Sequence, residues 1–229
     1  MERPEGIIYI VSLVIYNIIT VKGIKEILKG LIPVLVTYFA ITQLVSLILI
    51  KSGVNEIGFG NNDPYWKFVL GFSYEHNGKF NSPDYDKYAM KPEEAKKVVI
   101  DRIKDVKHIP GLMYNKIKIQ WLYDDLDQTF HATSTTQFSQ GIVQIMVTYI
   151  KVMNLIVIGL AFIGLIKNKN INKINYFFII NTLVYFGVYL LIEVCARYYY
   201  NPQVNIIILS SIGIERISKY IENKKTKEP

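Results

Sequence analysis

The chain has 229 residues, of which 51% are hydrophobic, 13% aromatic and 20% charged, and its mean hydropathy is +0.22. This composition excludes an ordinary soluble domain and a disordered chain, and it is typical of a membrane protein. The formal charge of +7 does not indicate a nucleic-acid partner, because the basic residues outside the long central loop lie beside apolar runs. The lone cysteine, Cys195, excludes an intrachain disulfide framework and a cysteine-rich metal site.

Apolar runs predict the membrane-spanning helices, because about 20 helical residues are needed to cross roughly 30 Å of hydrocarbon. Five such runs cover residues 7–21, 28–50, 141–166, 174–195 and 204–217. The first and last are short and reach the required length only with their flanks, the last as a helix from Pro202 to near Ile221. We therefore expect an all-α polytopic membrane protein with about five transmembrane helices and one extracytoplasmic, mainly helical loop subdomain.

Lysine and arginine residues predict the orientation of these helices. They concentrate in residues 22–29, in residues 167–173 and in the C-terminal tail, and the positive-inside rule places all three in the cytoplasm. The expected division is then two N-terminal transmembrane helices (1–50), an extracytoplasmic loop subdomain (51–140), three C-terminal transmembrane helices (141–221) and a basic cytoplasmic tail (222–229).

The loop subdomain contains one clear helical pattern. Pro92, followed by two glutamates, is typical of a helix start, and the Pro110–Gly111 pair is expected to end the run. Apolar residues recur at helical spacing in between, at Ala95, Val99, Ile103 and Val106. This face either packs on neighbouring elements or lies in the membrane surface. A second short helix is expected over residues 113–121, and a polar connector over residues 129–140.

An acidic cluster near the end of the loop is the candidate metal site. Asp125 and Asp127, next to Asp124, could place two carboxylates on one divalent cation, and the alternative is a turn or helix-cap role. The three histidines, His76, His108 and His131, have no ligand spacing, so a zinc site is not expected.

Two charged positions next to the apolar runs are candidate binding residues. Glu193 and Arg197 are four residues apart and are expected on one helix face at the outer end of the fourth span, with Tyr198 beside them. They either form an interfacial ion pair, or Arg197 binds a phosphate or sugar while Glu193 orients it. Lys151 lies within the third span, where an ionisable group is either functional or extends outward to the headgroups.

Several loop and helix-end segments resemble a group of large bacterial membrane glycosyltransferases. The matching residues are 64–72, Glu75, 78–81, Asp84, 118–121 and 193–202. In order and topological placement they resemble the protein O-mannosyltransferase group, whose architecture is called GT-C. The resemblance covers most of this chain and implies a multi-pass enzyme of the bacterial plasma membrane, which transfers a sugar from a polyprenyl-phosphate carrier to an extracytoplasmic acceptor, often with a metal ion.

The resemblance also implies which residues bind substrate. Arg197 would hold the lipid phosphate, Glu193, Tyr198 and Lys151 would be further substrate-binding residues, and the loop around Trp66 and Asn81 would cover the sugar.

The acidic outer-loop motif that carries catalysis in this family is not matched before the first span. The chain therefore resembles the C-terminal part of such an enzyme, without the catalytic N-terminal half, and its expected partners are the lipid bilayer, a polyprenyl-phosphate-linked sugar and an N-terminal partner subunit. The alternative is a non-catalytic accessory or assembly subunit of a cell-envelope complex.

Overall fold

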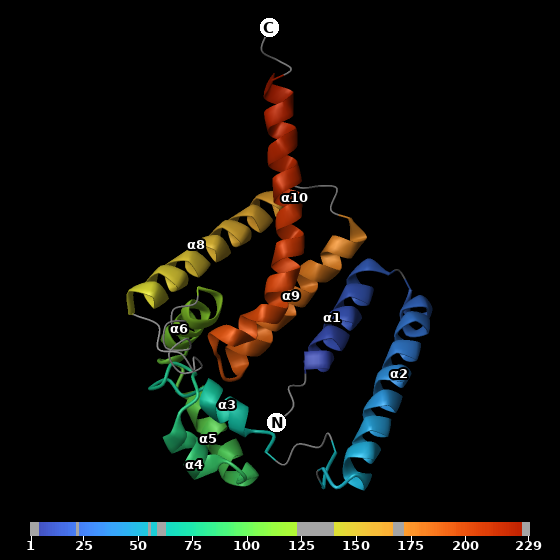
Figure 1. Cartoon of the computed structure of the whole chain (residues 1–229). Coiled ribbons are helices and arrows are strands. Elements are labelled where there is room, and N and C mark those ends of the chain that lie inside the picture. The colour runs from blue at the N-terminus through green and yellow to red at the C-terminus, as the bar shows by residue number, and fades with distance from the viewer. Residues whose placement is uncertain are drawn as a thin grey trace.

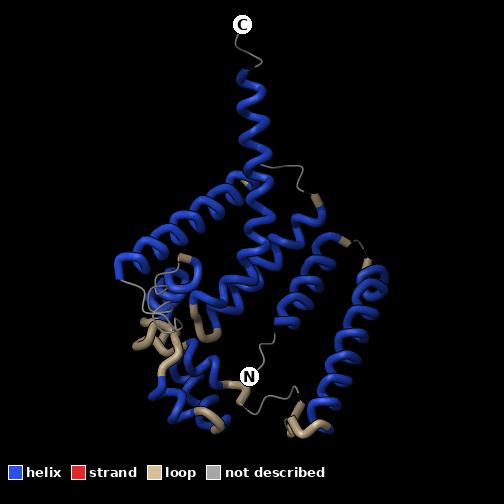
Figure 2. Tube along the Cα trace, in the orientation of Figure 1, coloured by secondary structure: helices blue, strands red, loops and turns tan. Residues whose placement is uncertain are grey.

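The computed structural model describes residues 5–21, 23–54, 56–58, 63–122, 140–166 and 172–225. Within these ranges the chain forms nine α-helices and one short 3-10 helix, with no strand (Figures 1 and 2). The all-α fold predicted from the sequence is therefore confirmed.

Five of the helices correspond to the five apolar runs. They are α1 (Glu5–Thr20), α2 (Ile24–Lys51), α8 (Gln140–Leu165), α9 (Lys173–Leu191) and α10 (Tyr200–Lys225). In the described part of the chain, three segments are long and apolar enough to cross a membrane, namely Ile24–Lys51, Gly141–Leu165 and Lys173–Leu191, and a shorter apolar helix covers Gly6–Thr20. The chain is thus a candidate multi-pass membrane protein with three such helices, and the membrane-spanning roles of α1 and α10 remain predictions.

The ends of the helices separate into two groups, and the sides of the membrane on which the two groups lie stay a prediction from lysine and arginine. The end of α1, the start of α2, the end of α8 and the start of α9 lie toward one end of the molecule, and α10 extends beyond them in the same direction (Figure 1). Helices α3 to α6 lie toward the opposite end. The guanidinium of Arg216, on α10, donates to the carbonyl oxygens of Ile163 and Ile166 and so caps the end of α8.

Helix α10 packs closely on α8 because small residues lie at the contact. A Cβ atom at Gly164 would come within 2.7 Å of the Gly213 nitrogen, and one at Gly213 would overlap the carbonyl oxygen of Leu160. Small residues of this kind let the backbones of membrane helices approach. Glycine is therefore required for this contact.

A chain of buried polar side chains links α10, α9 and α1. Asn205 donates through Nδ2 to Oδ1 of Asn181 at 2.6 Å, and Asn181 donates through Nδ2 to Oγ of Ser12 at 2.9 Å. Ser12 in turn donates to the carbonyl oxygen of Ile8 at 2.7 Å. Hydrogen bonds of this kind join helices within a membrane, where unpaired polar groups are costly.

The long central loop contains four helices. They are α3 (Trp66–Gly71), α4 (Ser82–Tyr88), α5 (Pro92–Lys104) and α6 (Ile109–Trp121). Their shared core consists of Val69, Phe72, Ala95, Val99 and Leu112. We call the unit formed by residues 63–122 the outer subdomain.

The predicted apolar face of α5 is only partly correct. Ala95 and Val99 are buried in the core, but Ile103 and Val106 are exposed. Helix α5 ends at Lys104, so Val106 lies beyond it, and Pro110 does not end that helix but lies in the first turn of α6. A proline without an N–H group is tolerated there, because the first-turn amides of a helix have no intrahelical partner.

Candidate functional site

The outer subdomain is fastened to the membrane helices at the end of α9, in a contact between main chains. The amide of Glu193 donates to the carbonyl oxygen of Lys67 at 3.0 Å, and the amide of Val194 donates to that of Gly78 at 2.9 Å. A Cβ atom at Gly71 would lie 2.5 Å from the carbonyl carbon of Ile192, so the approach also requires glycine at the end of α3. We call this contact the joint.

Lys116 of α6 is the central side chain of the joint. Its exposed fraction is 1%, and its Nζ donates to the carbonyl oxygens of Gly71 (3.0 Å), Leu190 (2.6 Å) and Ile192 (2.8 Å). Two of these acceptors are at the C-terminal end of α9, where the helix dipole favours a cation. Burial lowers the pKa of Lys116 to about 7, because the ammonium loses its contact with water. Three carbonyl oxygens offset this loss, since each accepts one of the three ammonium donors.

Lys67 brings together three of the residues expected to bind substrate. Its Nζ lies 3.5 Å from Oε2 of buried Glu193, 5.1 Å from the centre of the Trp66 ring and 5.5 Å from that of Tyr198. The hydroxyl of Tyr198 donates to the same carboxylate oxygen at 3.4 Å. Cation–π contacts and an ion pair therefore hold one lysine between two rings and a carboxylate.

The sequence offered no separate signal for Lys67 or Lys116, because a lysine in a loop of balanced charge is expected to be solvated. Lys67 is adjacent to Trp66 within the resembling segment 64–72, which is the nearest clue.

The expectation that Glu193 and Arg197 share one α-helical face is wrong. Helix α9 ends at Leu191 and Ile192 is extended, while Arg197 lies in the 3-10 helix η1 (Ala196–Tyr199). The physical reason is the joint: the amide of Glu193 bonds to the outer subdomain instead of continuing the helix. The structure describes the backbone of Arg197 and not its side chain.

Tyr198 also connects the joint to the membrane helices. Its ring stacks on that of Tyr189 at 5.4 Å between centroids, and Tyr189 stacks on Tyr185 at 6.0 Å. All three rings are buried. Tyr198 therefore packs inward against α9 and is not exposed to solvent.

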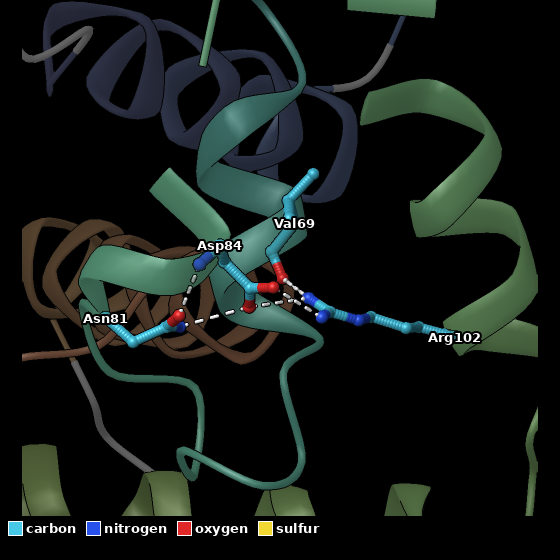
Figure 3. Close-up of polar contacts among 4 residues, drawn as sticks. All are labelled: Val69, Asn81, Asp84 and Arg102. Atoms are coloured by element: carbon cyan, nitrogen blue, oxygen red, sulfur yellow. Dashed lines mark hydrogen bonds and ion pairs between the residues drawn. The ribbon is translucent and has the colours of Figure 1, made fainter. Parts of the chain in front are cut away.

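Asn81 holds the outer subdomain together from within. It is the N-cap of α4, where its Oδ1 accepts from the amide of Asp84 at 2.8 Å and its Nδ2 donates to the Asp84 carboxylate at 3.1 Å (Figure 3). Arg102 of α5 donates to both Asp84 oxygens, at 2.7 and 3.0 Å, and to the carbonyl oxygen of Val69 at 2.6 Å. Helices α3, α4 and α5 are thus joined through the guanidinium of Arg102.

The charge of Asp84 is maintained by these neighbours. Burial acts to raise the pKa of Asp84, but hydrogen bonds from Arg102 and Asn81 and the positive charge of Arg102 outweigh burial and hold the pKa below its usual value. The carboxylate therefore stays ionised at neutral pH.

Trp66, beside Lys67, is largely buried and also packs edge to face against Tyr85, with 5.7 Å between ring centroids. The remaining predicted residues lie away from the joint or cannot be placed. Lys151 lies on α8, half-buried, one turn before Asn154. Asp125 and Asp127, and the connector at 129–139, lie outside the described residues, and no group of three potential metal ligands occurs among the residues that are described.

The structure thus brings together Glu193, Tyr198 and Trp66 around Lys67, at the C-terminal end of α9. Fold and site define an all-α candidate multi-pass membrane protein whose outer subdomain is bonded to one of its membrane helices. No family model, no curated protein and no solved structure matches this chain.

Proposed function

We propose that the chain is the C-terminal part of a membrane glycosyltransferase, which holds a sugar on a polyprenyl phosphate at the outer end of α9. The observation that carries the proposal is the joint. Lys116, Glu193 and Lys67 fasten the turn after α9 to the outer subdomain, and Arg197 follows within that turn. A cation at a fixed place on the membrane boundary suits the anionic phosphate of a lipid carrier.

In this proposal Glu193 and Arg197 have different roles. Glu193 is buried and already paired with Lys67, so it positions the turn and does not contact the substrate. Arg197 supplies the positive charge, and its planar donor group can bind two phosphate oxygens at once. The resemblance to the O-mannosyltransferase group supports the choice of a phosphate-linked sugar over other anions.

Catalytic residues are assigned to a partner in this proposal. An N-terminal partner subunit would supply the acidic catalytic residue, and a divalent metal would bind there or at Asp125 and Asp127. The site would face outward across the bacterial plasma membrane, as the lysine-rich connections predict.

Photocrosslinking tests the proposal directly. Membranes containing the full chain are incubated with a photoactivatable polyprenyl-phosphate hexose, and labelling of the chain is compared among variants. Arg197→Ala should abolish labelling, and Arg197→Lys should retain part of it because the charge remains. Lys104→Ala, which removes an exposed cation from α5, is the control and should label as the wild type does. Unchanged labelling of Arg197→Ala would contradict the assignment.

Sidedness is tested separately. In a variant lacking Cys195, a cysteine at Lys104 should react with an impermeant maleimide added outside intact cells, and a cysteine at Lys219 should not. The reverse pattern would place the outer subdomain in the cytoplasm and exclude the proposed site.

One observation favours the alternative, a non-catalytic subunit that assembles with another membrane protein. Helix α2 buries Leu31, but large apolar side chains such as Ile32, Phe39 and Leu47 are exposed along its length. A partner's membrane helix could pack there as well as lipid could. Wild-type labelling of Arg197→Ala, together with crosslinks from α2 to a second protein, would favour this function.

A further inference from the structure

We infer that the end of α6 enters the lipid bilayer from the outer side and lies among the membrane-spanning helices. The inference concerns how deeply the end of α6 lies in the membrane, and it does not depend on which of the two proposed functions is correct.

The first observation is the contact at the end of α6. Asn154 of α8 is buried, and its Nδ2 donates to the carbonyl oxygen of Trp121, the last residue of α6, at 2.6 Å. The candidate membrane span of α8 begins at Gly141 and ends at Leu165. At 1.5 Å per residue, Asn154 lies about 20 Å along the helix from Gly141, near the middle of that span. The end of α6 therefore meets α8 well inside the span.

The second observation is that α8 exposes large apolar side chains both before and after Asn154 along the helix. Before it, Ile145 and Tyr149 are 72% and 65% exposed, and after it, Leu155 and Phe162 are 54% and 65% exposed. Large apolar side chains exposed along a whole helix indicate contact with lipid rather than water. The hydrocarbon region therefore covers the half of α8 before Asn154 as well as the half after it.

A second candidate membrane helix places the ring of Trp121 closer to the membrane surface, but still inside the span. The ring of Trp121 packs on Phe186 of α9, with 5.4 Å between centroids, and on Tyr199 with 4.8 Å. Phe186 lies more than one turn before the end of the candidate span Lys173–Leu191. Phe186 is five residues, or about 7.5 Å of helix, before the end of that span, and Tyr199 follows the span. Both α8 and α9 therefore put the end of α6 below the membrane surface, at a depth between about 7.5 and 20 Å along these helices.

The chemistry of the last turns of α6 agrees with this position. Leu122 is partly exposed, and the Nζ of Lys118 lies 5.8 Å from the ring of Tyr114, one turn back toward the start of α6. A lysine that points back in this way keeps its charge near the headgroups. At the end of α6, Asn154 donates a hydrogen bond to the carbonyl oxygen of Trp121. Lipid chains have no donor for this oxygen.

The depth of Trp121 can be measured by fluorescence, because the chain has only two tryptophans. The Trp66→Phe variant of the full chain is reconstituted in vesicles whose phosphatidylcholine is brominated either near the headgroup or near the chain end. The Trp121→Phe variant reports Trp66 instead. We expect the brominated lipids to quench Trp121 at least about twofold more than they quench Trp66, since the end of α6 lies within the roughly 30 Å of hydrocarbon. Equal quenching of the two tryptophans would overturn the inference.

A labelling experiment keeps the inference testable if Trp66→Phe does not fold. In a Cys195→Ala background, Tyr149→Cys should resist an impermeant maleimide added outside, whereas Lys104→Cys should react. If both react at the same rate, the first half of α8 is in water and α6 does not enter the bilayer.

Discussion

Replacement of Lys116 by methionine should open the joint while leaving the helices intact. Methionine keeps most of the volume of the side chain and removes the three N–H donors. The carbonyl oxygens of Gly71, Leu190 and Ile192 would then lose their partner. A buried carbonyl without a partner costs about 1–3 kcal/mol, and removal of a buried charge recovers part of the total. We expect a net loss of about 3 kcal/mol, or roughly a hundredfold in the opening equilibrium of the joint.

Amide hydrogen exchange in detergent or nanodiscs measures the opening equilibrium of the joint directly. The amides of Glu193 and Val194 donate across it, so they exchange only when it opens. Their exchange should be about a hundredfold faster in Lys116→Met than in the wild type. Lys118→Met, the same change on the same helix at a half-exposed lysine, is the control and should differ little. Equal exchange in the wild type and Lys116→Met would refute the reasoning.

Three further predictions concern other contacts. The pKa of Asp84 in the folded protein lies below its usual value of 3.8. The Asp84 charge therefore stabilises the outer subdomain above pH 3.8, and this stabilisation is lost as the pH falls through the pKa of the folded protein. Asp84→Asn should therefore weaken the dependence of the unfolding free energy on pH in the acid range, measured by tryptophan fluorescence. The substitution should also lower that free energy by about 2 kcal/mol at neutral pH. Gly213→Ala should lower thermal stability in detergent by about 1–3 kcal/mol, whereas Gly159→Ala, whose Cβ meets nothing within 4 Å, should not. Asn181→Leu should cost about 1 kcal/mol, and a double-mutant cycle with Asn205→Leu should reveal coupling; additive costs would argue against a shared polar chain.

The helices themselves could be predicted, because each long apolar run forms one. Their ends could not. The apolar run at 174–195 suggested a helix through Cys195, but α9 ends at Leu191, where main-chain bonds to the outer subdomain replace helical ones. Such a partner is distant in the sequence and leaves no local signal. The end of α5 was missed for a related reason: Ile103 and Val106 continue the spacing, but both are exposed, and no element in the described part of the chain covers them.

Three of the residues predicted to bind substrate lie together, and their role in binding stays a prediction. Glu193, Tyr198 and Trp66 do meet, but the residue that joins them is Lys67, and the pair with Arg197 at helical spacing does not form on one helix. Hydropathy and motif order predict a binding site at the end of the fourth apolar run. Which charge neutralises a buried glutamate depends on how a separate subdomain lies on that end, and this follows only from tertiary structure.

The main-chain bonds at the joint have a mechanical consequence. Since Glu193 and Val194 are hydrogen-bonded directly to the backbone of Lys67 and Gly78, the end of α9 and the outer subdomain turn as one body. A thinner or thicker bilayer changes the tilt of a spanning helix. A change in the tilt of α9 would rotate the outer subdomain relative to the membrane surface. Lipid composition would then set the angle between the outer subdomain and the membrane.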